Sequence, residues 1–181
     1  MNYFLGYFPD QKTNQQLRMV MGKVGSIFDG QSIPVRWVKP ENFHVSVLFV
    51  GNDIGFAKKK LIAMRLKRTE IPSFEITFDN VQLGISRMHK GLIYVGIGEG
   101  GDKLRDLLFD LRKKLKHQDR GRYVPHLTLG RVSKDLLPQE SSNIRRDLKT
   151  INKEMSLEKL GISADRLRFV EGGEEEFKML N

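Results

Sequence analysis

The sequence contains no cysteine in its 181 residues. Disulfide bonds, a cysteine nucleophile and zinc sites built on thiolates are therefore excluded. Stability must come from the packing of apolar side chains, and any catalytic metal would depend on histidine and carboxylate ligands alone. Histidine is scarce as well, with four in the whole chain. Few side chains can therefore change their charge close to neutral pH.

Long apolar segments are also missing. No run approaches the roughly 20 residues that a membrane-spanning helix requires. Residues 1–16 carry no basic leader, and their apolar patch is too short for a signal peptide. We therefore predict a cytoplasmic protein that does not bind a membrane. With 39% hydrophobic and 9% aromatic residues, the chain has the composition of a folded globular protein.

Acidic residues are outnumbered by basic ones. The chain has 31 Lys and Arg against 22 Asp and Glu, which gives a formal net charge of +9. An excess of this kind raises the local concentration of polyanions and speeds their encounter with the protein. RNA, DNA or nucleotides are therefore natural partners, although many basic proteins are simply soluble. The charge indicates a partner but no chemistry.

Strand-like and helical segments alternate along the chain. Periodicity and turn residues predict a strand at 3–8, a helix capped by Asp10 or Thr13, a strand at 42–51, a helix from a cap at Asp53 to about residue 67, strands at 74–83 and 91–97, a helix at 102–116, a strand at 123–132, a helix at 138–152, and two or three short strands within 157–180. Both halves have the same order of elements, which is a weak internal repeat.

The two related halves predict the fold class. No linker, low-complexity tract or shift in composition divides the chain, so residues 1–181 are predicted to form a single domain. Strands and helices that alternate with hairpin-like links favour the α+β class. We predict two pseudo-symmetric, interleaved lobes of mainly antiparallel sheet, with outer helices, around a central cleft.

Two of the four histidines stand in the same local pattern of histidine, apolar, hydroxyl and apolar residue. The two motifs are His44-Val45-Ser46-Val47 and His126-Leu127-Thr128-Leu129. Two such matches among four histidines arise by chance in roughly one sequence in a thousand. On a strand, side chains two residues apart share a face, so His44 projects with Ser46 and His126 with Thr128. If the two strands are neighbours about a pseudo-two-fold axis, all four side chains converge on one cleft.

Paired imidazoles suit acid–base chemistry at a phosphodiester. Opening a 2′,3′-cyclic phosphate needs a base to take a proton from water and an acid to protonate the departing ribose oxygen. Imidazole, with a reference pKa of about 6.5, can do either. Each well-placed proton transfer contributes about 100- to 10,000-fold in rate. Hydroxyls and a nearby cation would hold the non-bridging oxygens. Ring strain and the neighbouring 2′-oxygen belong to the substrate, so the predicted reaction needs no metal or other cofactor.

Structural, metal-binding and serine-nucleophile roles account for the histidine motifs less well. A single histidine on an apolar strand is usually a satisfied core residue, but two in matching motifs reverse that judgement. A metal site would need further ligands, because each motif supplies one nitrogen and neither contains an acidic third ligand. Ser46 lacks the G-x-S-x-G context of a nucleophile elbow. His89 and His117 stand in polar surroundings and show no motif.

The residues around the motifs resemble the two-histidine phosphoesterase superfamily, whose signature is a pair of H-x-[ST]-x motifs about half a domain apart. Two blocks resemble its branch of RNA 2′,3′-cyclic phosphodiesterases, once called 2′–5′ RNA ligases. They are RWVKPENFHVSVLFVG at 36–51 and PHLTLGR at 125–131. The resemblance extends over nearly the whole chain in order and length, and these blocks are its specific part.

The resemblance implies a role for each residue of the site. His126 would be the proton acceptor that activates water, and His44 the donor that protonates the leaving 3′-oxygen, so that the product carries a 2′-phosphate. Ser46 and Thr128 would bind phosphate oxygens, and Arg131 would add positive charge beside them. The first motif has Ser46 at a position where threonine is commoner in the family, and serine keeps the hydroxyl group. The substrate would be an RNA end or an oligonucleotide, and the protein a monomer.

Several assignments stay open at the level of sequence. Arg131 fits an exposed arginine at a strand end equally well, and for Trp37 and Phe49 core packing competes with stacking on a base. The same site could act on another small cyclic or 2′–5′-linked nucleotide. A non-catalytic RNA-binding module is a further alternative, although a binder has little need for two titrating groups. A weak reverse reaction that joins RNA ends is also typical of the family.

Overall fold

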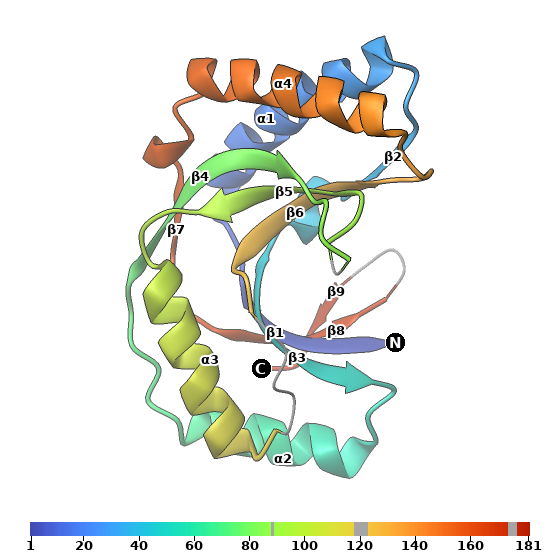
Figure 1. The fold of residues 1–181 in the computed structure, drawn as a ribbon. Coiled ribbons are helices and arrows are strands. Elements are labelled where there is room, and N and C mark those ends of the chain that lie inside the picture. The colour runs from blue at the N-terminus through green and yellow to red at the C-terminus, as the bar shows by residue number, and fades with distance from the viewer. Residues whose placement is uncertain (88, 118–122, 174–176) are drawn as a thin grey trace.

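The computed structural model describes residues 1–87, 89–117, 123–173 and 177–181. Within these ranges, nine strands form one curled sheet, and four α-helices lie outside it (Figure 1). In chain order the elements are β1 (Asn2–Tyr7), α1 (Gln11–Gly30), β2 (Val35–Trp37), η1 (Pro40–Asn42), β3 (Val45–Asn52), α2 (Phe56–Lys67), β4 (Glu75–Leu83), β5 (Leu92–Ile97), α3 (Gly101–Leu115), β6 (His126–Val132), α4 (Pro138–Glu154), η2 (Leu157–Lys159), β7 (Gly161–Ser163), β8 (Arg168–Gly172) and β9 (Phe177–Met179).

The sheet joins the two halves of the chain at its centre. Its strand order is β7-β4-β5-β6-β3-β1-β8-β9, and β2 pairs with the end of β6. All of these pairings are antiparallel. The central pair is β6 with β3, where Val45 lies opposite Leu127. Both side chains are fully buried. The two histidine motifs therefore meet in the middle of the sheet.

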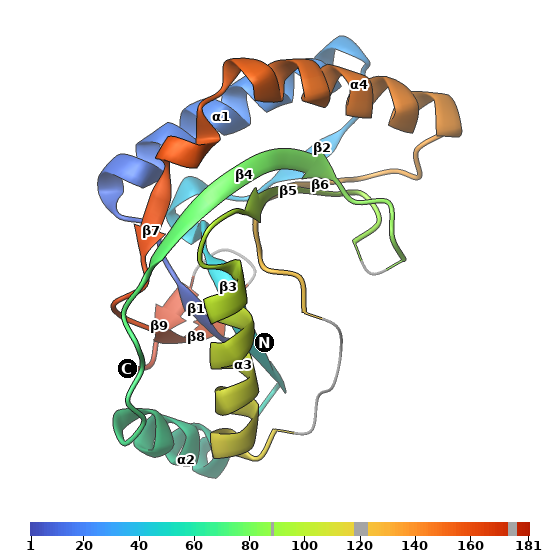
Figure 2. The same cartoon turned by 60° about the vertical axis from the view of Figure 1, so that its left-hand side comes forward.

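The helices cover both lobes of the sheet, and α1 and α3 each pack on the lobe that does not contain the strand before them in the chain. Helix α1 packs beside α4, and α4 lies against β4, whereas α3 lies against β3 and contacts α2 (Figure 2). The helix that follows β1 thus lies over the lobe of β4, β5 and β6, and the helix that follows β5 lies over the lobe of β3. Among the helices of the described residues, none combines the length and the apolarity that crossing a membrane demands.

The sequence predictions agree with this fold in class and in the order of elements. The α+β class with two lobes of antiparallel sheet is confirmed, and three short strands follow α4. Two details differ. The three-residue strand β2 was not predicted, because Gly30 and Pro34 end the periodic pattern before it and only its pairing with β6 makes it a strand. His44 lies just ahead of β3, which begins at Val45.

Helix capping followed the prediction at one site and not at another. The Asp10 carboxylate accepts a hydrogen bond from the Thr13 N–H at 2.7 Å and caps α1, as predicted. The prediction that Asp53 caps α2 was wrong, since Gly55 is the N-cap. Asp53 has a φ of 48° and pairs with the ammonium group of Met1 at 2.9 Å. Its carboxylate is engaged because β1 brings the chain terminus beside the end of β3.

One side chain of α4 protects the outer edge of β4. Strand β7 pairs only with Glu75–Thr77. Farther along β4, the Asn152 amide accepts a hydrogen bond from the Val81 N–H and donates one to the Val81 carbonyl, both at 2.9 Å. Asn152 therefore satisfies two backbone groups that β7 does not reach, and it attaches α4 to the sheet.

Replacement of Asn152 should destabilise the fold. Asn152→Ala leaves the part-buried N–H and carbonyl of Val81 without protein partners, so we expect the free energy of unfolding to fall by about 1–3 kcal/mol. Urea denaturation followed by circular dichroism measures the change. Asn143→Ala on the same helix is the control, because Asn143 accepts an exposed hydrogen bond from Gln139 of that helix. Equal losses in the two variants would contradict the role given to Asn152.

Candidate active site

Two imidazoles and two hydroxyls share one face at the centre of the sheet. Val45 and Leu127, the buried pair that joins β3 to β6, point into the core. The residues on either side of them in each strand therefore point to the opposite face. Continued by one residue each way, the antiparallel register places His44 across from Thr128 and His126 across from Ser46. All four are partly buried. The two histidines therefore occupy diagonal corners of a four-residue group.

Each histidine is oriented by the carbonyl two residues before it. His44 Nδ1 lies 2.7 Å from the Asn42 oxygen, and His126 Nδ1 lies 2.8 Å from the Val124 oxygen. Because a carbonyl only accepts, Nδ1 carries the hydrogen in both rings. In the neutral form, Nε2 is then the nitrogen that can take up a proton. The two motifs therefore fix the same tautomer at both positions.

Aromatic rings surround His44. Phe4 and Phe8 stack on the imidazole with ring centroids at 4.6 and 5.6 Å, and Phe177 meets it edge-on at 5.1 Å. This burial lowers the pKa of His44 to about 4, against the opposing effect of its backbone hydrogen bond, and the neighbouring His126 lowers it further. His44 is consequently neutral in the free protein at neutral pH.

His126 has a different environment. Its ring centroid lies 5.3 Å from that of His89 and 5.2 Å from that of Tyr94. Burial lowers the pKa of His126, and the neighbouring charge of His89 lowers it too. His89 is one of the site neighbours that sequence reasoning missed. It lies between β4 and β5, outside any strand, where periodicity cannot show which side chain turns toward the site.

A β-bulge brings Arg131 to the same face as Thr128. Regular alternation would place them on opposite faces, because they are three residues apart. The pairing of β5 with β6 shifts register, since Tyr94 lies opposite Thr128 whereas Ile93 lies opposite Gly130. The extra residue of β6 restores Arg131 to the site face. Gly130 allows β2 to approach β6 closely, because a Cβ there would lie 3.0 Å or less from atoms of Trp37 and Arg36.

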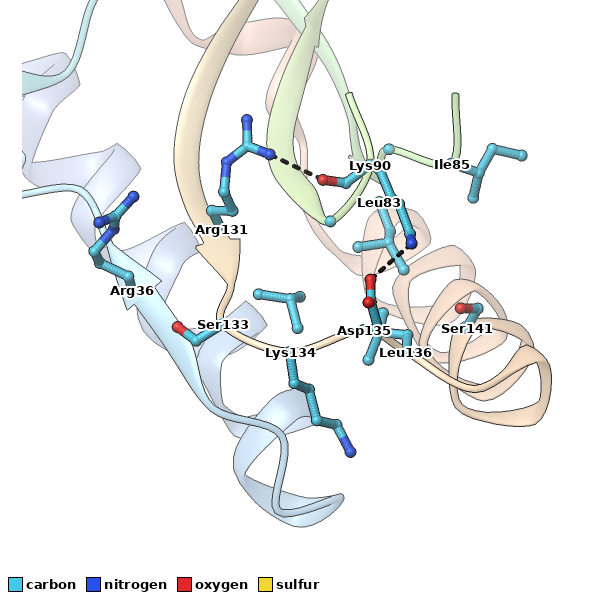
Figure 3. A pocket seen from close by; sticks show the side chains of 13 residues that line it. Arg36, Leu83, Ile85, Lys90, Arg131, Ser133, Lys134, Asp135, Leu136 and Ser141 are labelled. Atoms are coloured by element: carbon cyan, nitrogen blue, oxygen red, sulfur yellow. Dashed lines mark hydrogen bonds and ion pairs between the residues drawn. The ribbon is translucent and has the colours of Figure 1, made fainter. Parts of the chain in front are cut away.

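Arg131 is exposed at the far end of β6, in a pocket of about 610 Å³ (Figure 3). Its Nη1 donates a hydrogen bond to the Lys90 carbonyl at 2.9 Å. This bond holds the guanidinium without neutralising its charge. The residue therefore combines the exposure of a strand-end arginine with a defined orientation on the site face.

The two aromatic residues left open by the sequence lie in different places. Trp37 is partly buried and packs edge-on against Phe28 at 6.0 Å, so it belongs to the core. Phe49 is 46% exposed and lines a small pocket of about 260 Å³ together with His44 and Ser46. Of the two, Phe49 is therefore the one available to a ligand.

A family model described as the 2′-5′ RNA ligase superfamily matches residues 39–174. The chain belongs to this superfamily. Among curated relatives, an "RNA 2′,3′-cyclic phosphodiesterase" of Archaeoglobus fulgidus is 25% identical over 136 residues, 74% of each chain. One of the same name from Aquifex aeolicus is 24% identical over 137 residues, 71% of this chain and 69% of its own.

Solved structures share the fold of this superfamily member over almost its whole length. E. coli LigT complexed with 3′-AMP aligns with a TM-score of 0.70 at 16% identity, covering 99% of this chain and 95% of that one. The protein TT0787 of Thermus thermophilus aligns with the same TM-score and identity, covering 100% and 96%. Among the described residues, no group of three or more histidine and acidic side chains is placed to hold a metal ion.

The aromatic surroundings of His44 should control its pKa. By NMR titration of the imidazole, we expect a pKa of about 4 for His44 in the wild type. Phe177→Ala admits water, so the pKa should rise toward its ordinary value. Because the folded state favours the neutral ring, its contribution to stability is present above pH 6.5 and is lost as the pH falls from 6.5 to 4. This loss should be smaller in Phe177→Ala.

Phe109→Ala is the matched control, since Phe109 is 70% exposed on α3. The pKa of His44 should not change in that variant. A pKa that stays equally low in Phe177→Ala would show that the edge-on ring does not keep water from the imidazole.

Proposed function

We propose that this protein is a phosphoesterase that hydrolyses the 2′,3′-cyclic phosphate end of RNA to a 2′-phosphate. The observation that carries the proposal is the pair of imidazoles with the same tautomer, diagonal to each other across two hydroxyls. The two curated relatives are named RNA 2′,3′-cyclic phosphodiesterases, and a structural neighbour is complexed with 3′-AMP. These names support a phosphoesterase with an RNA or nucleotide substrate.

The proposed reaction assigns one proton transfer to each histidine. His126 Nε2 takes a proton from water as the water oxygen attacks phosphorus. The bond from phosphorus to the ribose 3′-oxygen breaks, and His44 donates the proton that this oxygen gains. Ser46 and Thr128 donate hydrogen bonds to non-bridging oxygens, and Arg131 adds positive charge from the end of β6. The diagonal placement of the imidazoles suits attack on one side of phosphorus and departure on the other, without a metal.

The donor role of His44 requires it to be protonated when substrate is bound. In the free protein its ring is neutral, because burial lowers its pKa to about 4. An anionic phosphodiester beside the ring favours the charged form and raises this pKa. Once protonated in such dry surroundings, the imidazolium gives up its proton readily. Because the two rings interact, the pH dependence of the rate reports the pair rather than either residue.

The small pocket beside His44 favours a second candidate substrate. A volume of about 260 Å³, lined by Phe49 and Phe4, offers aromatic faces to a single base. A small cyclic or 2′–5′-linked nucleotide would use such a pocket as readily as an RNA end, and a panel of both substrate kinds separates them. Cytoplasmic location, a monomeric state and a weak reverse ligation stay predictions.

Removal of either imidazole should abolish most activity. His44→Ala and His126→Ala should each lower kcat by about 100- to 10,000-fold, the contribution of one placed proton transfer. Circular dichroism should show an intact fold. His117→Ala is the control, because His117 lies outside the site beside α3. Turnover close to wild type in either site variant would refute the assigned pair.

The reaction itself is tested with a short RNA that ends in a 2′,3′-cyclic phosphate. Incubated with the protein in EDTA, the RNA should gain the mass of one water, and regiochemical analysis should find only the 2′-phosphate. Activity that disappears in EDTA would contradict the metal-free mechanism, and a 3′-phosphate product would contradict the leaving group. An unchanged substrate would refute the proposed function.

A further inference from the structure

Two arginines face each other at the end of the sheet beyond the histidine motifs. Strand β2 pairs with β6 so that Arg36 lies opposite Arg131. Directly opposite residues of an antiparallel pair project from the same face with Cβ atoms about 5 Å apart, and like charges placed in this way repel. Both side chains are exposed. The arrangement lowers the stability of the unliganded sheet and favours an anion that bridges the two guanidinium groups.

The other cations of this pocket have acidic partners. Lys90 pairs with Asp135 at 2.6 Å, and Lys134 pairs with Glu140 at 2.6 Å. Neither arginine has a carboxylate partner in the part of the chain that the structure describes. In Figure 3 both arginines project on the side of the pocket away from the Lys90–Asp135 pair. The positive charge left without a counter-charge is therefore concentrated on the two guanidinium groups.

The chemistry of the pair suits a phosphodiester. A guanidinium presents planar donors in a fork that matches phosphate oxygens. One N–H group of Arg131 donates to the Lys90 carbonyl, and this bond orients the guanidinium. The other N–H groups of Arg131 stay available to a ligand. A phosphodiester carries one negative charge and two non-bridging oxygens. One such group can therefore accept hydrogen bonds from both arginines.

The position of the pair separates this anion from the reacting phosphate. Arg131 follows Thr128 by three residues of β6, but one of them is the extra residue of the bulge, so the separation along the sheet is that of two residues, roughly 7 Å. Arg36 lies on β2, level with Arg131. A phosphate held between Ser46 and Thr128 is centred on the row of Val45 and Leu127, roughly 10 Å along the sheet from the arginine pair, so the pair faces a different phosphate of a bound chain. The bulge nevertheless keeps all of these groups on one face, so a single chain can pass over them.

We propose that Arg36 and Arg131 bind an internal phosphodiester of the RNA, one or two nucleotides before the reacting end. This inference rests on the proposed function and narrows its substrate to an oligonucleotide, because a cyclic mononucleotide has no internal phosphate. Arg36 then selects substrates by length without touching the reacting atoms.

The test compares three substrates: a 2′,3′-cyclic mononucleotide, a trinucleotide with the same end, and that trinucleotide with uncharged methylphosphonate linkages. Arg36→Gln should lower kcat/KM about tenfold on the charged trinucleotide, the loss of a charge-assisted contact, and leave the other two within about twofold. The slope of log(kcat/KM) against log[salt] for the charged trinucleotide should become shallower by about 0.7, as expected when one single-strand phosphate contact is lost.

Two further variants control the experiment. Arg36→Lys keeps the charge but not the fork, so it should recover part of the loss. Arg68→Gln removes an exposed arginine at the end of α2 and should change none of the three rates. The melting temperature of Arg36→Gln should stay the same or rise, because a repulsion is removed. An equal loss on all three substrates, or no loss on the charged trinucleotide, would overturn the inference.

A measurement of binding affinity tests this inference independently of the proposed function. The affinity of the wild type for a trinucleotide that ends in a 2′-phosphate should exceed that of Arg36→Gln by about tenfold in a titration that needs no turnover. If the wild type hydrolyses none of the substrates, the proposed function fails, and equal affinities in this titration would refute the phosphodiester site as well. A preserved difference would support the site as an RNA-binding feature in its own right.

Discussion

The site depends on one contact at the centre of the sheet, where Val45 meets Leu127. Both side chains are fully buried, so the core fixes which way each strand faces. A slip of one residue would turn the histidine of the slipped strand into the core and its apolar anchor toward the site. Register is strongly specified wherever one face of a strand is buried. The apolar positions of the two motifs therefore determine the geometry of the catalytic candidates as much as the histidines do.

The same motif yields two imidazoles with different properties. Each ring donates from Nδ1 to a carbonyl two residues earlier, so the local geometry is repeated. The surroundings are not repeated, because aromatic rings of β1 and β9 enclose His44, whereas the segment between β4 and β5 places His89 beside His126. Environments that separate the titration of two like groups are how a site divides acid and base roles. The asymmetry therefore comes from the elements that surround the two motifs and not from the motifs themselves.

The features that were predicted correctly from the sequence are those that nearby residues determine. Helical periodicity, the Asp10 cap and the alternation within the histidine motifs depend on nearby residues, and each agrees with the structure. The failures depend on contacts between distant segments. Asp53 pairs with the chain terminus, β2 is a strand only because β6 lies beside it, and the bulge before Gly130 is visible only in the pairing with β5. Alternation alone would have turned Arg131 away from the site face.

Part of the excess positive charge is placed where it destabilises the sheet, and this placement indicates where an anion binds. Net charge by itself says only that polyanions are attracted. Opposed arginines on neighbouring strands are more specific, because a sheet gains nothing from their repulsion and neither is neutralised by a carboxylate of the described residues. Local destabilisation of this kind persists where binding offsets it, and stability is commonly lower at functional sites. The catalytic group is built from the repeated motifs, whereas the arginine pair needs β2, which the repeat does not include, beside the end of β6. Recognition of the chain can therefore be changed through Arg36 without altering the groups that perform the chemistry at its end.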